Sequence, residues 1–266
     1  MAEDIGPGDV TSSLTVGEGA RGRGRIVAKA DGVLAGVTAA AEVLRLACDG
    51  DVEFSAASAD ANHVAPDHVV LEFEGNARGL LAGERTALNL LCHLSGIATL
   101  TARFVAAVEG TGAKVLDTRK TTPGLRVMEK HAVVMGGGVN HRFALYDAVL
   151  VKENHLAFGT SLAEALAARP RGMPAIVEAE DMDEFRSART AGADVVMLDE
   201  FTPEQVAAAR AERGDDAVPL LEVSGGISLD TIRPYAEAGA DRISIGALTH
   251  SAPALDLSMR LEPVPH

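Results

Sequence analysis

The chain contains few aromatic residues and few cysteines. Of its 266 residues none is tryptophan, 3% are aromatic and two are cysteine. Proteins that bind single-stranded nucleic acid stack its bases on aromatic rings and follow its backbone with a basic surface. Because the formal net charge is -14, we do not expect this chain to bind nucleic acid.

The two cysteines and the paired histidines are expected to be structural. Cys48 and Cys92 lie in helical apolar patterns, which predicts reduced core residues in a cytoplasmic protein. No apolar run reaches the ~18 residues of a membrane span, and no signal peptide pattern opens the chain. His63 and His68 flank a Pro-Asp turn and lack a third metal ligand, so we interpret them as surface loop residues.

One segment is basic although the chain is acidic. Residues 114–152 hold four of the five lysines, and seven basic residues there face only three acidic ones. A solvated charged face is the plainer interpretation. These charges, however, follow apolar strands and lie among glycines, which is not typical of a polar helix. A basic cluster of this kind attracts a small anion.

The first part of the chain mixes strands and helix without a regular repeat. Residues 3–11 (EDIGPGDVT) predict a Gly/Pro loop that runs into a short strand. Arg21, Arg23 and Arg25 alternate with glycine on one face of a strand, most simply an exposed face. A helix over 39–46 and strands over 52–54 and 68–73 complete an amino-terminal α+β domain, residues 1–95. A helix then begins near residue 83, breaks at Ser95-Gly96 and gives way to a second helix that reaches Val108.

From residue 113 onward the pattern becomes regular. Six apolar β-type runs end near Asp117, Lys152, Glu180, Asp199, Ser224 and Gly246. Helical stretches separate several of them, over 162–168, 182–191, 203–210 and 229–238. Apolar strands alternating with helices predict a parallel sheet covered on both faces. Their spacing favours a TIM-like β/α barrel over residues 96–249, with the chemistry at the carboxyl ends of the strands. We expect the tail, residues 250–266, to pack back on the amino-terminal domain.

Two late strand ends are rich in glycine. Residues 224–227 (SGGI) lead into a helix that Ser228 is expected to cap, and Gly246 follows the last strand. Glycine lets backbone N–H groups approach an anion, and a phosphate site after the last two strands recurs in such barrels. Together the two turns predict a phosphate ligand.

Acids and further cations share these strand ends. Glu180 and Asp199 are suited to hold Mg²⁺ or to stabilise a developing cation, although a buried ion network with Lys120 and Lys152 is an alternative. Lys152 also allows a Schiff-base aldolase. The other cationic candidates exceed what one carbonyl substrate needs, and fit a substrate with several carboxylates plus a pyrophosphate: Arg119, Lys120, His141 and Arg142.

Nine motifs in this order resemble the quinolinate phosphoribosyltransferase family: EDIGPGDVT, GERTALNLLCHLSGIAT, DTRKTTPGLR, EKHAVVMGGGVNHR, LVKENH, VEAE, MLDE, LEVSGGI and GADRISIGALTHS. The resemblance spans nearly the whole chain. It implies that quinolinate and phosphoribosyl pyrophosphate react, with Mg²⁺, to give nicotinate mononucleotide, pyrophosphate and CO₂. It also implies a homodimer in which an open α/β barrel faces the partner's amino-terminal domain, and leaves room for a higher oligomer of dimers.

The same resemblance assigns roles by motif position. It gives quinolinate the ligands Arg85 (from the neighbouring subunit), Arg119, Lys120, His141, Arg142 and Lys152. It gives phosphoribosyl pyrophosphate the ligands Lys120, Lys152, Glu180, Asp199, Ser224, Gly225 and Gly246. The implied catalytic residues are Lys120, Lys152, Glu180 and Asp199, and the last two are the implied Mg²⁺ ligands, partly through water. Glu222 resembles a further strand-end acid to which no role is assigned.

Three departures from the family pattern stand out. Only Met1 and Ala2 precede the first motif, where the family usually has a helix, Glu153 replaces an aspartate, and Glu200 replaces an asparagine. Three other interpretations stay open: a nicotinate phosphoribosyltransferase, a related protein encoded with molybdate transport, and a phosphate-binding scaffold. The number of cations opposes the first, the His141-Arg142 pair and KENH oppose the second, and the converging strand-end charges oppose the third.

Overall fold

The computed structural model describes residues 1–265, which form two compact units. The first unit contains residues 1–100 and 127–136 and the chain from residue 252 onward. The second contains residues 101–126 and 137–251. Compared with the predicted boundaries after residues 95 and 249, this division places residues 96–100 and 127–136 in the first unit and residues 250–251 in the second.

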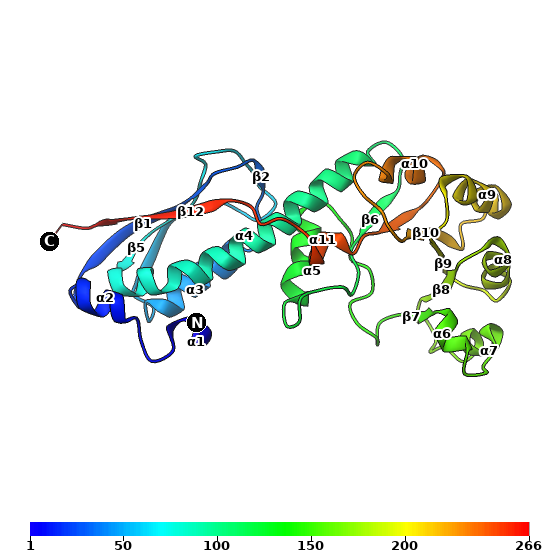
Figure 1. The fold of residues 1–266 in the computed structure, drawn as a ribbon, viewed down its shortest axis with the longest axis horizontal. Helices are drawn as coiled ribbons and strands as arrows, with labels where there is room; N and C mark the ends of the chain where they lie inside the picture. Colours follow the sequence, from blue (N-terminus) through cyan, green and yellow to red (C-terminus); the bar gives the residue numbers. More distant parts are fainter. Residues whose placement is uncertain (266) are drawn as a thin grey trace. The chain divides into compact units, whose positions relative to one another are not determined.

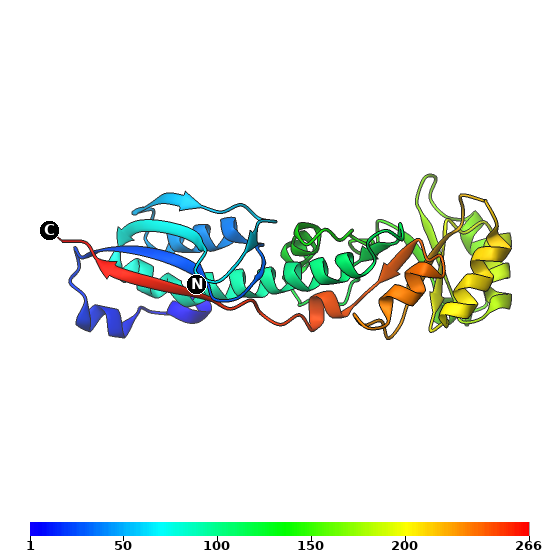
Figure 2. The same cartoon turned by 90° about the horizontal axis from the view of Figure 1, so that it is seen from above.

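The first unit is an antiparallel sheet with helices on one face (Figure 1, Figure 2). The strand order is β12-β1-β5-β3, formed by Leu257–Pro263, Arg21–Ala28, Val69–Asn76 and Val52–Ala57. A small second pair joins β2 (Gly32–Val33) to β4 (His63–Val64). Its longer helices are α3 (Val37–Ala47), α4 (Ala77–Ala107), whose residues to Leu100 belong here, and α5 (Arg126–Met135), whose residues from Val127 belong here. The carboxyl-terminal strand β12 thus pairs with β1.

The core of this unit lies between the sheet and helices α3 and α4. Ile26 and Phe73 from the sheet are fully buried in one cluster with Leu44 of α3 and Leu91 of α4. Gly24 makes room for the Phe73 ring, because a Cβ atom there would stand 2.3 Å from ring carbon Cε2. Cys48 is a buried free thiol in the same cluster, and burial raises its pKa to about 11, as expected for a reduced core residue.

The prediction of a loop and strand at the amino terminus was wrong. Residues 2–5 and 10–15 form two short helices, α1 (Ala2–Ile5) and α2 (Val10–Thr15). Asp9 caps α2, because its Oδ1 accepts the backbone N–H of Ser12 at 3.0 Å. An aspartate followed by a few polar residues is a helix-start signal. The neighbouring glycines and proline favoured a loop instead, so this signal was not recognised in the sequence.

The prediction of a helix break at Ser95-Gly96 was also wrong, since α4 runs without interruption from Ala77 to Ala107. Tertiary contacts occupy both residues. Ser95 Oγ accepts the N–H of Ala35 at 3.1 Å, and a Cβ atom at Gly96 would stand 2.2 Å from the carbonyl oxygen of Pro253. By length and composition alone α4 is apolar enough to cross a membrane. Its fully buried Leu80, Leu91, Leu94 and Ile97 are typical of a core helix.

The second unit is a six-stranded parallel sheet with the order β6-β11-β10-β9-β8-β7. The strands are Lys114–Leu116, Arg242–Ser244, Leu220–Ser224, Val195–Asp199, Ala175–Ala179 and Val149–Val151. Because β11 returns to pair with β6, the strands follow their chain order around a barrel. In the described chain β6 and β7 do not pair, so the barrel is open between them. A barrel-like α/β fold, as the six apolar runs predicted, is confirmed.

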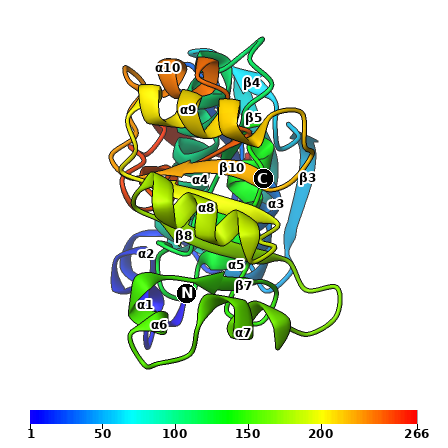
Figure 3. The same ribbon diagram turned by 90° about the vertical axis from the view of Figure 1, so that its right-hand side faces the viewer.

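Helices cover the outside of this barrel, with α8 and α9 in front of strands β8 and β10 in Figure 3. They are α6 (Glu153–Leu156), α7 (Leu162–Ala167), α8 (Met182–Thr190), α9 (Pro203–Arg213), α10 (Ile232–Glu237) and α11 (Ala247–His250). The predicted cap at Ser228 was wrong, because α10 begins later, after Thr231. Ser228 instead opens a turn, and its carbonyl oxygen accepts the N–H of Thr231 at 3.2 Å.

Side chains inside the barrel lie in layers. Ala148, Ile176, Val195 and Met197 form an apolar cluster with Leu150 and Leu220 near the amino ends of the strands. Successive side chains of a strand point to opposite faces. Residues two positions beyond Ile176 and Leu220 therefore point inward as well, and these are Glu178 and Glu222. A charged layer thus lies above the apolar one.

Candidate functional site

The carboxyl ends of the six strands gather the candidate residues of the second unit. Parallel strands end at one rim of a barrel, and residues from five predicted strand ends follow this rule. Lys152 follows β7, Glu180 follows β8, Asp199 ends β9, Ser224 ends β10 and Gly246 follows β11. Arg119 and Lys120 lie in the loop after β6, and His141 and Arg142 in the segment before β7.

Hydrogen bonds hold the loop that carries Arg119 and Lys120. The carbonyl oxygen of Lys120 accepts the Thr249 hydroxyl at 2.8 Å, and its N–H donates to Thr118 Oγ1 at 3.0 Å. The Arg126 guanidinium donates to Thr121 Oγ1 at 2.9 Å and to the carbonyl oxygen of Phe143 at 3.3 Å. The loop backbone is thereby fixed while the side chains of Arg119 and Lys120 stay exposed.

Arg142 lies half-buried beside Arg119. Its Nη1 donates to the carbonyl oxygen of Ala148 at 3.2 Å, which directs the side chain. Burial lowers the pKa of Arg142, and the positive charge of Arg119 lowers it further. The nearby carboxylate of Asp147 accepts the backbone N–H of Ala144 at 2.9 Å and also that of Phe143. Two guanidinium groups that repel each other make a site for an anion with more than one negative charge.

A buried carboxylate lies beneath this pair. Glu222 on β10 is fully buried, with its Oε1 3.1 Å from His141 Nε2 and its Oε2 3.0 Å from Arg242 Nε. The Ser244 hydroxyl also donates to Oε1. Burial raises the pKa of Glu222, but the contact with His141, the charge of Arg242 and the bond from the Ser244 hydroxyl outweigh it, so the pKa is lowered overall. Glu222 is therefore an ionised carboxylate inside the barrel.

Lys152 has an acid partner that the motifs did not reveal. Its Nζ forms an ion pair with Oε2 of Glu178 on the neighbouring strand β8. The Lys152 side chain is 44% exposed and that of Glu178 only 9%, so the lysine keeps one side toward solvent. The backbone N–H of Lys152 donates to His155 Nδ1 at 2.9 Å and fixes the turn after β7.

Glu180 and Asp199 form the acidic side of the rim. The pKa of Glu180 is raised, most by the charge of Glu153, then by burial and by the charges of Glu184, Glu178 and Asp199. Crowded carboxylates of this kind are eased by a divalent cation. No group of three or more acidic, histidine or cysteine side chains able to hold a metal occurs in residues 1–265. A cation here would therefore take further oxygen ligands from water or from a ligand.

Two glycine turns complete the rim. Gly225 and Gly226 have φ values of +98° and +57°, a backbone form that side chains disfavour. Gly225 borders Asp199, since a Cβ atom there would lie 3.5 Å from Asp199 Oδ1. At Gly246 a Cβ atom would stand 2.8 Å from Lys120 Cδ and 3.2 Å from His250 Nε2. The glycine thus lets the backbone approach Lys120.

Not every residue of the basic segment joins the rim. Lys130 is buried in α5 of the first unit, and Lys114 is exposed at the opposite end of β6 from Arg119. Arg85 is exposed on α4 of the first unit. The prediction of a single basic cluster over residues 114–152 was wrong for Lys114, because it lies at the amino end of its strand, and for Lys130, because its helix belongs to the first unit.

Sequence reasoning also missed three residues beneath the rim: Glu178, Arg242 and Ser244. The signal for Glu178 was present, because it stands two positions before Glu180 and period two places both on the same face. Arg242 and Ser244 carry the same signal on β11, relative to Gly246. For His141, both ring nitrogens already have protein partners, and its role as a quinolinate ligand stays a prediction.

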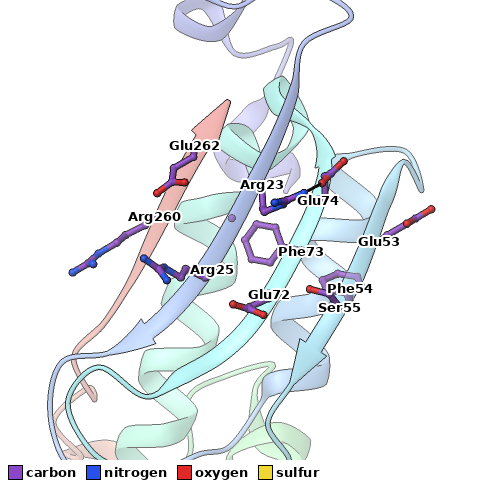
Figure 4. A pocket seen from close by; sticks show the side chains of 11 residues that line it. Arg23, Arg25, Glu53, Phe54, Ser55, Glu72, Phe73, Glu74, Arg260 and Glu262 are labelled. Atoms are coloured by element: carbon purple, nitrogen blue, oxygen red, sulfur yellow. Dashed lines mark hydrogen bonds and ion pairs between the residues drawn. The ribbon is translucent and has the colours of Figure 1, made fainter. Parts of the chain in front are cut away.

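The first unit carries a separate hollow of about 530 Å³ on the open face of its sheet. Figure 4 shows its arginines on β12 and β1 and its glutamates on β5, β3 and β12. Arg23 pairs with Glu74 at 2.9 Å, and the predicted exposed face for the arginines of β1 is confirmed. Exposed ion pairs of this kind contribute little to folding stability. None of the predicted site residues lines this hollow.

Known proteins resemble this chain over almost its full length. The sequence model of the quinolinate phosphoribosyl transferase C-terminal domain matches residues 97–260, and that of the N-terminal domain matches residues 9–95. The nicotinate-nucleotide pyrophosphorylase [carboxylating] of Mycobacterium leprae is 42% identical over 98% of this chain and 94% of its own length. A probable enzyme of the same name from Bacillus subtilis is 41% identical over 97% and 89%.

A solved structure agrees with these sequence matches. The nicotinate-nucleotide pyrophosphorylase from Francisella tularensis superposes with a TM-score of 0.92 at 37% identity, and the match covers 98% of this chain and 92% of that one. Both domain models match in the expected order, and the strand-end motifs lie at one rim of the barrel. This chain therefore belongs to the quinolinate phosphoribosyltransferase family.

Proposed function

We infer that the rim of the barrel is where this chain performs the reaction of its family. The name carboxylating pyrophosphorylase describes the reaction from nicotinate mononucleotide, pyrophosphate and CO₂. In the biosynthetic direction the phosphoribosyl group passes from phosphoribosyl pyrophosphate to quinolinate, and CO₂ is lost. The product, nicotinate mononucleotide, leads to NAD.

The pairing of Arg119 with Arg142 carries this inference. Quinolinate is a pyridine with two adjacent carboxylates, and planar guanidinium groups match carboxylates better than a lysine ammonium does. Burial and the charge of Arg119 lower the pKa of Arg142. The two positive charges repel each other, and a bound anion would remove this repulsion. We propose that Arg119 and Arg142 bind the two carboxylates, with His141, Lys120 and Lys152 beside them.

The opposite side of the rim suits phosphoribosyl pyrophosphate. The turn at Ser224 and Gly225 and the turn at Gly246 offer backbone N–H groups to the 5′-phosphate. Lys120 borders Gly246 and Lys152 keeps an exposed side, so both are in position to meet the pyrophosphate. Glu180 and Asp199 would hold Mg²⁺ together with water and the substrate, and the ion would neutralise pyrophosphate charge as it leaves.

The residues of the rim support both chemical steps. The ring nitrogen attacks the sugar carbon as pyrophosphate leaves, through a cation-like sugar that the carboxylates of Glu180 and Asp199 stabilise. Holding both reactants in place supplies much of the rate enhancement. After transfer the ring nitrogen is positively charged, so it stabilises the electron pair left when CO₂ departs from the adjacent carbon, and a proton from water then takes the place of CO₂ on that carbon.

We further propose a cytoplasmic homodimer in which the partner subunit supplies Arg85. In the described chain Arg85 belongs to the first unit, while every other proposed ligand belongs to the second. Several large apolar side chains are exposed in the single chain: Val10, Leu14, Leu145, Tyr146 and Phe158. Exposed apolar residues in such numbers are typical of surfaces that a partner covers. Any further assembly of dimers would use surfaces that the dimer contact leaves exposed.

A parallel assay tests the substrate. With Mg²⁺ and phosphoribosyl pyrophosphate, the protein should release CO₂ from carboxyl-labelled quinolinate and leave nicotinate and nicotinamide largely unchanged. Arg142→Lys keeps the charge but loses the planar fork, so it should raise the KM for quinolinate more than the KM for phosphoribosyl pyrophosphate. Comparable turnover of nicotinate would refute the assignment and favour a nicotinate phosphoribosyltransferase.

Subunit exchange tests the role of Arg85. Arg85→Ala and Lys152→Ala should each be nearly inactive alone. In a mixed dimer one site combines the intact Lys152 of one subunit with the intact Arg85 of the other, and the second site carries both defects. Random exchange of equal amounts makes about half the dimers mixed, so activity should return to about a quarter of wild type. Proven exchange without recovery would place Arg85 within its own chain or outside the site.

A further inference from the structure

Glu222 is a buried charged residue to which the proposed reaction gives no role. It lies in the charged layer inside the barrel, below the rim, and its side chain is fully buried. Its two oxygens contact three residues: His141, Arg242 and Ser244. A carboxylate removed from water at this depth costs free energy, which such contacts must offset.

The contacts of His141 determine where its ring proton lies. The backbone N–H of Arg142 donates to His141 Nδ1 at 2.7 Å, so Nδ1 must carry a lone pair. The proton of the neutral ring therefore lies on Nε2, which is 3.1 Å from Glu222 Oε1. The backbone N–H of His141 donates to the buried carboxylate of Asp117 at 2.9 Å. Ring and backbone are thus fixed from two sides.

We propose that Glu222 is a positioning residue that sets the place of Arg142 through His141. By accepting the Nε2 proton, Glu222 holds the ring in the tautomer whose Nδ1 accepts the Arg142 N–H. That bond fixes the backbone from which the Arg142 guanidinium reaches the rim. Glu222 touches no substrate, and the effect on quinolinate rests on the function proposed above.

A glutamine cannot replace Glu222 in this arrangement, although it has the same shape. If its amide oxygen faces His141, its NH₂ group faces the Arg242 guanidinium, and two donors oppose each other. If the amide is reversed, its NH₂ group faces His141 Nε2 and favours a ring proton on Nδ1. The Arg142 N–H then loses its acceptor. Either orientation leaves one buried donor without an acceptor.

The tautomer of His141 is the first test, and it needs neither a variant with altered Glu222 nor enzyme activity. In protein labelled with ¹⁵N-histidine, the His141 signals are identified by their loss in His141→Gln. We expect a neutral ring with the proton on Nε2 in the wild type. A proton on Nδ1, or a doubly protonated ring at neutral pH, would overturn the proposal. If quinolinate is not a substrate, the proposed function fails, but this spectrum still decides the tautomer of His141 that the contact with Glu222 requires.

Kinetics provide the second test, with Ser244→Ala as the matched control. Ser244 contacts the same carboxylate but not His141, so its loss should leave the His141 tautomer and both KM values near wild type. Glu222→Gln should raise the KM for quinolinate about tenfold and change the KM for phosphoribosyl pyrophosphate less than about twofold. A purely structural defect would instead lower the active fraction and leave both KM values unchanged. That result in a folded Glu222→Gln protein with an unaltered His141 spectrum would refute the proposal.

Discussion

Glu200 occupies a backbone conformation that glutamate disfavours, and this leads to a quantitative prediction. It follows Asp199 at the end of β9 with a φ of +55°. Its N–H donates to the carbonyl oxygen of Ser224 at 3.1 Å, which ties it to the neighbouring strand end. This left-handed region costs a residue with a Cβ atom about 1–2 kcal/mol. The cost is lower for asparagine, because its short side chain can form a hydrogen bond to the nearby backbone.

The magnitude follows from that difference. Glu200→Asn relieves part of the strain and should stabilise the protein by about 0.5–1 kcal/mol, which raises Tm by about 1–3 °C in a domain of this size. Glu200→Gly relieves all of the strain, but it adds about 0.4–1 kcal/mol of unfolded-state entropy. The glycine variant should therefore gain about 0–1.6 kcal/mol, a range that includes the gain expected for the asparagine variant.

The same substitution should affect ligand binding. The Glu200 side chain lies against the Ser224-Gly225 turn, since a Cβ atom at Gly225 would be 3.2 Å from Glu200 Cγ. A negative charge beside the proposed phosphate site opposes phosphate binding by about 0.5–1 kcal/mol in a solvated setting. Glu200→Asn should thus lower the KM for phosphoribosyl pyrophosphate by about two- to fivefold.

Urea unfolding and steady-state kinetics measure these two effects. Glu18→Asn is a suitable control, because Glu18 is an exposed turn residue of the first unit, and it is not among the described residues with positive φ. This substitution removes the same charge without relieving backbone strain, so the stability of the protein should change little. If Glu200→Asn is no more stable than Glu18→Asn, the backbone at Glu200 stores no strain and the reasoning is wrong.

Three further predictions concern the barrel. Glu222→Ala leaves His141 and Arg242 without their carboxylate and should destabilise the protein by about 3–5 kcal/mol in chemical unfolding. Because the folded pKa of Glu222 is lowered, its contribution to stability is present above the unfolded pKa of about 4.3 and is lost as pH falls through the folded pKa. Glu222→Gln should therefore make the free energy of unfolding depend less on pH in acid. Gly246→Ala brings a methyl group to 2.8 Å from Lys120 Cδ and should raise the KM for phosphoribosyl pyrophosphate about tenfold with little change in Tm. Lys152→Arg should keep some substrate binding while Lys152→Ala loses most activity, whereas a borohydride-trapped adduct on Lys152, seen by mass spectrometry, would establish a Schiff base instead.

The barrel was predictable because most of its strands begin with residues that are apolar on both faces. Most of the six runs open with a short stretch of Val, Ile, Leu, Ala or Met before the first polar residue, and such strands fit a sheet covered by helices. The regular alternation with helices then favoured barrel closure. The rim followed directly, since each run ends at a polar or glycine residue and parallel strands all end on one side.

The failures came from places where long-range contacts override local signals. Ser95-Gly96 resembles a helix break, but Gly96 is small so that the Pro253 carbonyl can approach α4. A single sequence cannot reveal a contact between residues so far apart. Lys130 was grouped with the rim by its position in the sequence, yet α5 packs into the first unit. Charge density along the chain therefore overestimates charge density in space.

The acids beneath the rim follow the period-two rule of strands, which is not visible when each motif is considered alone. Glu178 stands two residues before Glu180, and Glu222 stands two residues before Ser224, so each points inward one layer below a rim residue. Each of these acids contacts a different part of the cationic side: Glu178 pairs with Lys152, and Glu222 contacts His141, which holds Arg142. The cations come from loops or follow directly after a strand, where the local sequence does not determine the position of a side chain. The strands therefore supply acids at fixed positions, and these acids hold the side chains that carry or position the cations of the rim.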